Sequence, residues 1–223
     1  MKNELVKIIS IEHATPDVLH IVTQRPKDIS FVPGQATEIF LSKDNWENEG
    51  RPFTFTGLPN ENHLEFYIKT YPSHHGVTNQ LLSLKSGEEL IVNDVFGAIN
   101  YKGEGTFIAG GAGVTPFIAI LRDLRNKSKL GKNKLIFANK KKSDIILKSE
   151  FEEMLQNNFI NILSEEETKE YAHGRITSDF IKNNCNSLNS YFYLCGPPPM
   201  MDAVEKQLKT LNVSDNLIVK EAF

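Results

Sequence analysis

The chain has 223 residues, 24% of them charged, and a formal net charge of −3 at pH 7, values typical of a globular protein large enough for two small domains. This weak net charge gives no reason to expect nucleic acid or an anionic membrane as a partner. No apolar stretch approaches the roughly 20 residues of a membrane span, and the first residues lack a signal-peptide core, so we expect a cytoplasmic protein. Two cysteines, Cys185 and Cys195, are too few for a four-cysteine iron–sulfur cluster, and we expect no metal site.

The first part of the chain has the pattern of an antiparallel β-domain. Alternating apolar and polar residues predict strands at 4–13, 17–24, 36–42, 51–57, 63–71 and 88–94. Turn-forming stretches such as VPGQ, LPNEN and KSGEE separate these strands, and a helical segment at 76–84 interrupts the series. The pattern favours a sandwich or barrel.

After Gly103 strands alternate with helices. The expected strands are GTFIAG, NKLIFAN, FINILS, SYFYLCG and the closing NLIVKEAF. Helices are expected at 115–127, 146–156, 178–183 and 198–211. This alternation predicts a parallel sheet with helices on both faces, so we expect two domains, residues 1–103 and 104–223.

The segment RPFTFTG, residues 51–57, fits two interpretations. Phe and Thr favour strands, so it can be an ordinary half-buried strand. It can also bind a ligand: Arg51 would pair with an anion, Phe53 would stack on a flat ring, and Thr54 would hydrogen-bond the edge of that ring. The segment alone leaves both interpretations open.

The stretch FIAGGAGVTPF predicts a phosphate-binding turn between a buried strand and a helix. Gly110, Gly111 and Gly113 allow a ligand to approach the backbone closely, whereas a plain turn needs one glycine at most. Thr115 and Pro116 suit the start of a helix, whose free N–H groups attract phosphate. The spacing is G-x-G-x-x-P rather than the Rossmann G-x-G-x-x-G.

A second strand ends in a similar turn, YLCGPPPMM, which contains Cys195, Gly196 and Pro197. The carboxyl ends of parallel strands meet at one edge of the sheet, where open α/β sheets bind ligands. Cys195 then either lines a ligand site or is a small buried hydrophobic residue.

Taken in order, these motifs resemble those of the ferredoxin–NADP reductase family of flavin-dependent oxidoreductases, over essentially the whole chain. RPFT is similar to the family's arginine-x-tyrosine-serine flavin motif, and HGVTNQL to its glycine-x-x-serine/threonine helix start. GGAGVTPF and CGPPPMM are similar to its two nicotinamide motifs, and KEAF to its glutamate-x-aromatic ending. The resemblance implies an N-terminal antiparallel Greek-key β-barrel that binds FAD and a C-terminal Rossmann-like α/β domain, with a parallel sheet, that binds NAD(P).

By this resemblance Arg51 pairs with the flavin pyrophosphate, Phe53 stacks on the isoalloxazine, and Thr54 donates a hydrogen bond near flavin N5. The family usually has tyrosine at the position of Phe53, so stacking is kept while a hydroxyl contact to the ribityl chain is lost. The other residues expected at the flavin are Pro52, Ile68, Lys69, Tyr71, Gly76, Val77, Thr78 and Phe223. Thr78 can instead be a plain helix cap.

The residues that the resemblance places at the nicotinamide nucleotide are Gly111, Gly113, Thr115, Pro116, Ser164, Glu165, Cys195, Gly196 and Pro197. Thr54, Cys195, Glu221 and Phe223 are expected at the reaction centre, with the ring of Phe223 covering the flavin face that the nicotinamide must reach. From the sequence alone, Glu221 would be a solvated residue of a charged tail.

The coenzyme preference is expected to follow from Ser164 and the three glutamates after it. Relatives that use NADP tend to have serine followed by arginine here, where the arginine meets the 2′-phosphate. Glu165 would repel that phosphate and could accept a hydrogen bond from the 2′-hydroxyl of NAD, so we expect NADH rather than NADPH. Lys140, Lys141, Lys142 and Arg175 would compensate the acidic charge if they fold nearby.

The combined expectation is an FAD-dependent oxidoreductase that takes a hydride from NAD(P)H and passes electrons to a separate carrier, such as a flavodoxin, a ferredoxin or an oxygenase component. One alternative is a free-flavin reductase, which a pyrophosphate site in GVTNQL disfavours. Another is a subunit whose flavin relays electrons within a larger complex.

Overall fold

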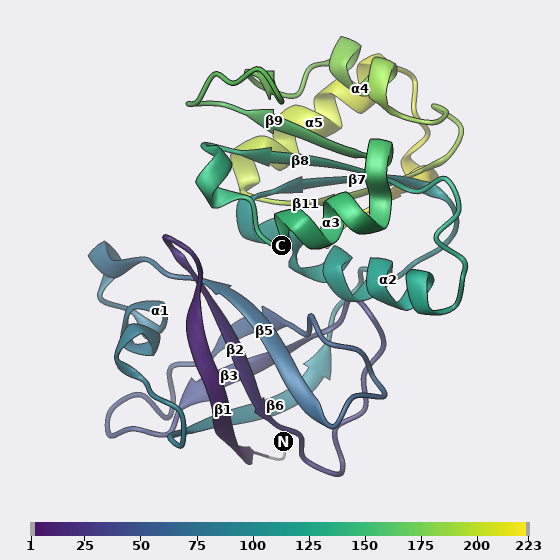
Figure 1. Cartoon of the computed structure of the whole chain (residues 1–223). Helices are drawn as coiled ribbons and strands as arrows, with labels where there is room; N and C mark the ends of the chain where they lie inside the picture. Colours follow the sequence, from purple (N-terminus) through teal and green to yellow (C-terminus); the bar gives the residue numbers. More distant parts are fainter. Residues whose placement is uncertain (1–2, 222–223) are drawn as a thin grey trace. The chain divides into compact units, whose positions relative to one another are not determined.

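The computed structural model describes residues 3–221, which form two compact units, each with its own sheet (Figure 1). The first unit comprises the residues up to Asn100 together with Thr115–Asp123, and the second comprises Tyr101–Val114 and the residues from Leu124 onward. Within the described part of the chain, no helix has the length and apolar character needed to cross a bilayer.

The first unit is built on six antiparallel strands. Their bounds are β1 Glu4–Thr15, β2 Val18–Gln24, β3 Ala36–Leu41, β4 Arg51–Thr54, β5 His63–Lys69 and β6 Glu89–Phe96. They pair in the order β4-β3-β6-β1-β2-β5. The backbone N–H of Thr56, just after β4, donates to the carbonyl of Glu65 on β5 at 2.9 Å, which joins the two outer strands. The predicted antiparallel Greek-key barrel is confirmed.

Period-two alternation fills the barrel with apolar side chains. Val6 and Ile8 on β1 and Ile39 and Leu41 on β3 point inward and are buried. Phe55, just beyond β4, is fully buried and stacks on Phe31 with ring centroids 4.1 Å apart. The second half of RPFTFTG is therefore a core segment.

The helical segment predicted at 76–84 is shorter and less regular than expected. It consists of a single α-helical turn, α1 (Val77–Gln80), followed by a 3₁₀ turn at Leu81–Ser83. Val77 and Leu81, one turn apart, bury their side chains in the barrel core, so packing rather than helix propensity holds this segment.

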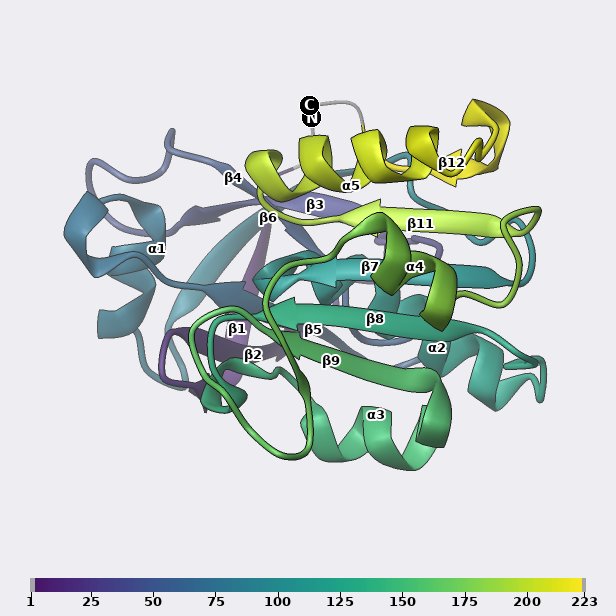
Figure 2. The ribbon, with the colours of Figure 1, turned by 90° about the horizontal axis from the view of Figure 1, so that it is seen from above.

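The second unit is a parallel sheet whose strand order is β10-β9-β8-β7-β11-β12. The strand bounds are β7 Gly105–Gly110, β8 Lys134–Asn139, β9 Phe159–Leu163, β10 Ala172–His173, β11 Tyr191–Cys195 and β12 Ile218–Val219. Figure 2 shows β11, β7, β8 and β9 side by side in that order. The strand order reverses direction between β7 and β11, which is the switch point where such sheets bind ligands.

Helices cover both faces of this sheet, as predicted. Their bounds are α3 Lys148–Leu155, α4 Ser178–Asn184 and α5 Pro198–Thr210. The helix that follows β7, α2 (Thr115–Asn126), belongs to the first unit as far as Asp123. Ile181 of α4 and Val204 of α5 join the core cluster on one face. On the other face, Phe151 of α3 lies edge-on to Phe137 of β8, with centroids 6.4 Å apart. The Rossmann-like fold class is confirmed.

Two strands differ from the prediction. β10 was not predicted, because two residues are too short for any period to be visible. Within the described residues, the closing strand expected over 216–223 covers Ile218–Val219 and begins late because a 3₁₀ turn at Asp215–Leu217 precedes it. The other 3₁₀ turns are Pro72–His74, Gly111–Val114, Lys142–Asp144 and Gln156–Asn158.

Candidate functional site

The predicted flavin strand β4 begins with a half-exposed arginine. Arg51 donates to the carbonyl of Gly50 at 2.7 Å and lies 3.5 Å from the carboxylate of Glu49, with 50% of its side chain exposed. Both partners belong to the loop before β4, and an exposed pair of this kind contributes little stability. The guanidinium can therefore turn to a phosphate at small cost, so Arg51 fits a pyrophosphate ligand.

Phe53 and Thr54 are half-buried at the end of the same strand. Phe53 packs against the edge of the barrel core while its neighbour Phe55 is fully enclosed. A ring that is supported on one side and accessible on the other suits stacking on a flat ligand. Pro52, between Arg51 and Phe53, is exposed.

The other residues expected at the flavin differ in how accessible they are to a ligand. Ile68 and Val77 are each 1% exposed in the barrel core, so their side chains cannot contact a ligand and only their backbones could. Lys69 forms an ion pair with Asp17. The exposed ring of Tyr71 stacks on His74, with centroids 5.2 Å apart.

Gly76 supports a close ligand approach. A Cβ placed on Gly76 would meet nothing nearer than the carbonyl of His74 at 4.0 Å, so the backbone there is open. Gly76 is the N-cap residue of α1, and among the described residues no side chain caps that helix, so Thr78 does not have the alternative role of a helix cap. A four-residue helix offers a weaker dipole than the longer helix predicted from sequence.

The glycines at the end of β7 and in the nucleotide turn after it differ in how closely other atoms pack against them. A Cβ on Gly110 would lie 2.3 Å from Met200 Sδ, and one on Gly113 would lie 2.3 Å from the carbonyl oxygen of Cys195. These two glycines let the turns after β7 and β11 pack together, so they do not by themselves indicate a ligand, contrary to the sequence argument. Gly111, with φ +52° and no atom within 4 Å of a built Cβ, fits close ligand approach.

Two of the expected reaction-centre residues, Cys195 at the end of β11 and Glu221, are close enough to interact electrostatically. Burial raises the pKa of the Cys195 thiol to about 12, and the negative charge of Glu221 acts in the same direction. A thiol with this pKa stays neutral at pH 7, so Cys195 is not a thiolate nucleophile. Gly196 is less tightly packed than Gly110 and Gly113, since its Cβ would lie 3.1 Å from Met200 Sδ. Pro197 is the N-cap residue of α5.

The acidic loop after β9 lies beside the lysines that follow β8. Lys140 pairs with Glu165 at 2.9 Å, and the N–H of Glu165 donates to the carbonyl of Lys140 at 3.0 Å. Lys142 pairs with Glu170 at 2.6 Å. Ser164 is tied to Asn139 by its backbone N–H, at 2.9 Å. Two of the compensating lysines considered from sequence, Lys140 and Lys142, do fold nearby, and each is paired with a glutamate of the loop. The backbone N–H of Lys141 instead donates to the carboxylate of Asp144, at 3.0 Å.

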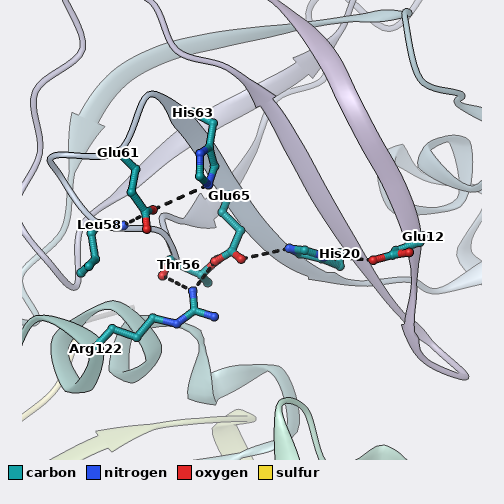
Figure 3. Close-up of polar contacts among 8 residues, drawn as sticks. All are labelled: Glu12, His20, Thr56, Leu58, Glu61, His63, Glu65 and Arg122. Carbon is teal, nitrogen blue, oxygen red and sulfur yellow. Dashed lines mark hydrogen bonds and ion pairs between the residues drawn. The ribbon is translucent and has the colours of Figure 1, made fainter. Parts of the chain in front are cut away.

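Phe223 and its expected role lie outside the described residues. The sequence reasoning also missed one group, the buried cluster around Glu65 (Figure 3). A signal was present in HLEFYIK, where a lone carboxylate stands between Leu64 and Phe66 in a strand that is otherwise nearly apolar. A charge at such a position needs partners, and these come from segments too distant to be paired by inspection.

A closed antiparallel barrel and a parallel sheet with two packed glycine turns define the class: a two-unit nucleotide-binding protein. A family model described as "Oxidoreductase NAD-binding domain" matches residues 107–206. The chain is 30% identical over 207 residues to NADH-cytochrome b5 reductase 1 of Aspergillus oryzae, covering 84% of this chain and 70% of that protein. It is 27% identical over 228 residues to the anthranilate 1,2-dioxygenase electron transfer component of Acinetobacter baylyi, covering 96% of this chain and 65% of that protein.

Among solved structures, the flavohem-like FAD/NAD binding domain of nitric oxide dioxygenase from Vibrio cholerae matches with a TM-score of 0.88 and 20% identity, covering 100% of this chain and 99% of that one. The chain spans 51–71% of the length of four curated relatives that it matches. It belongs to the ferredoxin–NADP reductase family of FAD-containing NAD(P)H oxidoreductases, as the motifs predicted.

Proposed function

We propose that this protein takes a hydride from NADH and passes the electrons to a separate redox protein. We assign FAD binding to a domain of residues 1–103 and NAD(P) binding to a domain of residues 104–223. The observation that carries the proposal is the open backbone of Gly111 in the turn after β7, which the packing of Gly113 against the carbonyl oxygen of Cys195 holds next to the turn after β11. The residues expected beside the nicotinamide are thereby attached directly to the turn expected to bind its phosphates.

FAD, when bound, would supply the chemistry that no side chain performs, accepting a hydride and releasing electrons singly. The work of the chain is then to bind and orient. Arg51 would hold the pyrophosphate, Phe53 would support the ring, and Thr54 would hydrogen-bond its edge. At Gly111, which has no side chain, the nicotinamide nucleotide would approach the backbone closely enough to accept hydrogen bonds from its N–H groups. Cys195, whose thiol stays protonated, would form a small uncharged part of the binding surface and would form no covalent bond with the substrate.

The preference for NADH rests on the acidic loop. Residues 164–171 carry four glutamates and one lysine, Lys169, a net charge of −3 within the loop. Lys140 and Lys142, from outside the loop, pair with Glu165 and Glu170 and leave a net charge of −1. A 2′-phosphate would be repelled there, whereas a 2′-hydroxyl can donate to a carboxylate. The relatives named as NADH-cytochrome b5 reductases support this direction.

The acceptor is proposed to be a one-electron redox protein. Relatives are named as reductases of cytochrome b5 and as electron transfer or reductase components of dioxygenase and monooxygenase systems. The chemistry that these relatives share is a redox protein that receives electrons one at a time. We therefore propose an acceptor of this class, with ferredoxins and flavodoxins included.

The test is anaerobic reduction of the purified FAD-loaded protein by NADH, followed by three acceptors in parallel: a haem protein, a ferredoxin and free FMN. We expect flavin reduction by NADH and transfer to at least one protein acceptor. Transfer to free FMN alone would establish the free-flavin reductase instead. Flavin reduction with no transfer to any added acceptor would support a relay subunit of a larger complex.

A further inference from the structure

Glu65 on β5 is a buried carboxylate at the centre of a polar cluster (Figure 3). The residue is 8% exposed. Its Oε2 accepts hydrogen bonds from Thr56 Oγ1, at 2.8 Å, and from Arg122 Nη1. Its Oε1 lies 3.0 Å from His20 Nε2. Both carboxylate oxygens are therefore engaged by donors from three separate segments of the chain.

The charge of Glu65 is fixed at neutral pH. Burial acts to raise its pKa, but the hydrogen bond with His20, the charge of Arg122 and the hydroxyl of Thr56 outweigh burial and lower the pKa to about 2. His20 in turn has a raised pKa because of its hydrogen bond with Glu65, against the effect of burial. Its ring stacks on Tyr67, and Glu12 lies 3.5 Å from Nδ1. The cluster therefore provides a permanent anion for Arg122.

Arg122 donates hydrogen bonds to two groups of the barrel at once. Its Nη1 donates to the Glu65 carboxylate and also, at 3.0 Å, to the backbone carbonyl of Thr56. Thr56 is two residues beyond Thr54, at the end of the strand that carries the expected flavin contacts. A guanidinium held by a carboxylate and a carbonyl has restricted freedom to slide or rotate.

Helix α2, which carries Arg122, begins at the nucleotide turn. Residues Thr115–Asp123 belong to the same compact unit as the barrel, so the contacts of Arg122 lie within that unit. Thr115 is joined by a single peptide bond to Val114, the last residue of the turn after β7. The cluster thus fixes, on the barrel, the helix whose first residues are expected to receive the nicotinamide nucleotide.

Stability alone is a weak reason for this arrangement. A buried ion pair often contributes no more to stability than apolar side chains of the same volume, because both charges lose their hydration. The same helix also carries Arg125, paired with Glu153 at the surface, where no such desolvation is involved. The buried pair adds a defined orientation of α2 relative to β5, because hydrogen bonds depend on distance and angle whereas apolar contacts do not.

We propose that Glu65 and Arg122 are positioning residues for hydride transfer, which hold α2, from its first residue Thr115 onward, in register with the flavin strand. The proposal rests on the proposed function. It assigns no contact with substrate to either residue: both act through the helix and the strand that they join.

The test compares the FAD-loaded wild type with Glu65→Gln and Arg122→Met, with Arg122→Lys as the conservative variant and Arg125→Met as the matched control on the same helix. Single-turnover reduction by NADH separates the limiting rate from the apparent Kd. A misplacement near 1 Å lowers such rates by about 100-fold, so we expect a loss of about 10- to 100-fold in the limiting rate with a much smaller change in Kd. Arg122→Lys should recover part of the rate, and Arg125→Met should match the wild type.

Hydrogen exchange supplies a readout that does not depend on activity. Amides of α2 should exchange faster in Glu65→Gln than in the wild type, while those of α5 should not change. Wild-type limiting rates in both Glu65→Gln and Arg122→Met, with FAD retained, would overturn the proposal, as would unchanged exchange in α2. Should Glu65→Gln fail to retain FAD, Arg122→Lys and Arg122→Met still decide the question. A wild type that NADH does not reduce would instead overturn the proposed function itself.

Discussion

Replacing Glu65 by Gln should make the barrel less stable at neutral pH and almost equally stable in acid. The folded-state pKa of Glu65 is about 2, against an ordinary value of 4.5. Each pKa unit corresponds to about 1.4 kcal/mol, so the ionised carboxylate contributes about 3 kcal/mol to the free energy of unfolding at pH 7. Because the folded-state pKa is depressed, this contribution is complete above about pH 4.5 and is lost as the pH falls toward 2.

The single tryptophan of the chain provides the assay. Trp46 packs against the barrel core, so its fluorescence reports unfolding of the first unit. Urea unfolding of the wild type and of Glu65→Gln, at a fixed excess of FAD and at several pH values, gives the difference in the free energy of unfolding. We expect about 3 kcal/mol at pH 7 and a steady decline of the difference below pH 4.5.

Glu153→Gln is the control, since Glu153 is the exposed partner of Arg125 on α2 and its side chain is 71% accessible. A surface pair contributes about 0–1 kcal/mol, so this variant should follow the wild type at every pH. A difference between Glu65→Gln and the wild type that is small at pH 7, or that persists unchanged to pH 2–3, would refute the assignment of Glu65 as a strongly stabilised buried anion.

Three further substitutions test the binding residues. Arg51→Ala should weaken FAD binding by roughly 10- to 150-fold, since a charge-assisted hydrogen bond contributes about 1.5–3 kcal/mol, and Arg51→Lys should recover only part of this loss. FAD titration measures both affinities, and an unchanged affinity in Arg51→Ala would contradict the role of Arg51 in binding the pyrophosphate. Glu165→Arg should shift the ratio of kcat/KM for NADH over NADPH by about tenfold or more toward NADPH. Glu167→Arg makes the same change in charge but should shift this ratio less, because Glu165 is the residue expected to meet the 2′ position. Phe223→Ser should tighten NAD⁺ binding, as a stacked ring worth about 0.5–1.5 kcal/mol no longer competes; an unchanged difference spectrum in NAD⁺ titrations would show that Phe223 does not cover the flavin.

The fold was predictable because the hydrophobic period changes once, near Gly103. Period-two strands before it and alternating strands and helices after it define the two sheets, and the structure has both. Sequence patterns failed where local signals were short. β10 has two residues, and the segment after Gly76 is held by buried Val77 and Leu81 rather than by helix propensity.

The binding motifs were predictable only in part. Arg51 is half exposed and the backbone of Gly111 is open, which fits their predicted roles without testing them. Gly110 and Gly113 are explained by close packing between two turns, which no single motif can reveal. The cluster around Glu65 joins residues 45 and 57 positions apart in the chain. Such pairings depend on tertiary structure, so a buried carboxylate in an apolar strand predicts that partners exist without identifying them.

An anaerobic titration of the purified FAD-loaded protein with NADH, followed through the visible absorbance of the flavin, shows whether the protein is a nicotinamide-dependent flavin reductase. We expect stoichiometric loss of the oxidised-flavin band, and its return when an oxidised one-electron redox protein is added. A protein that binds FAD and keeps the oxidised band in excess NADH and in excess NADPH would contradict the assignment as a nicotinamide-dependent flavoprotein reductase.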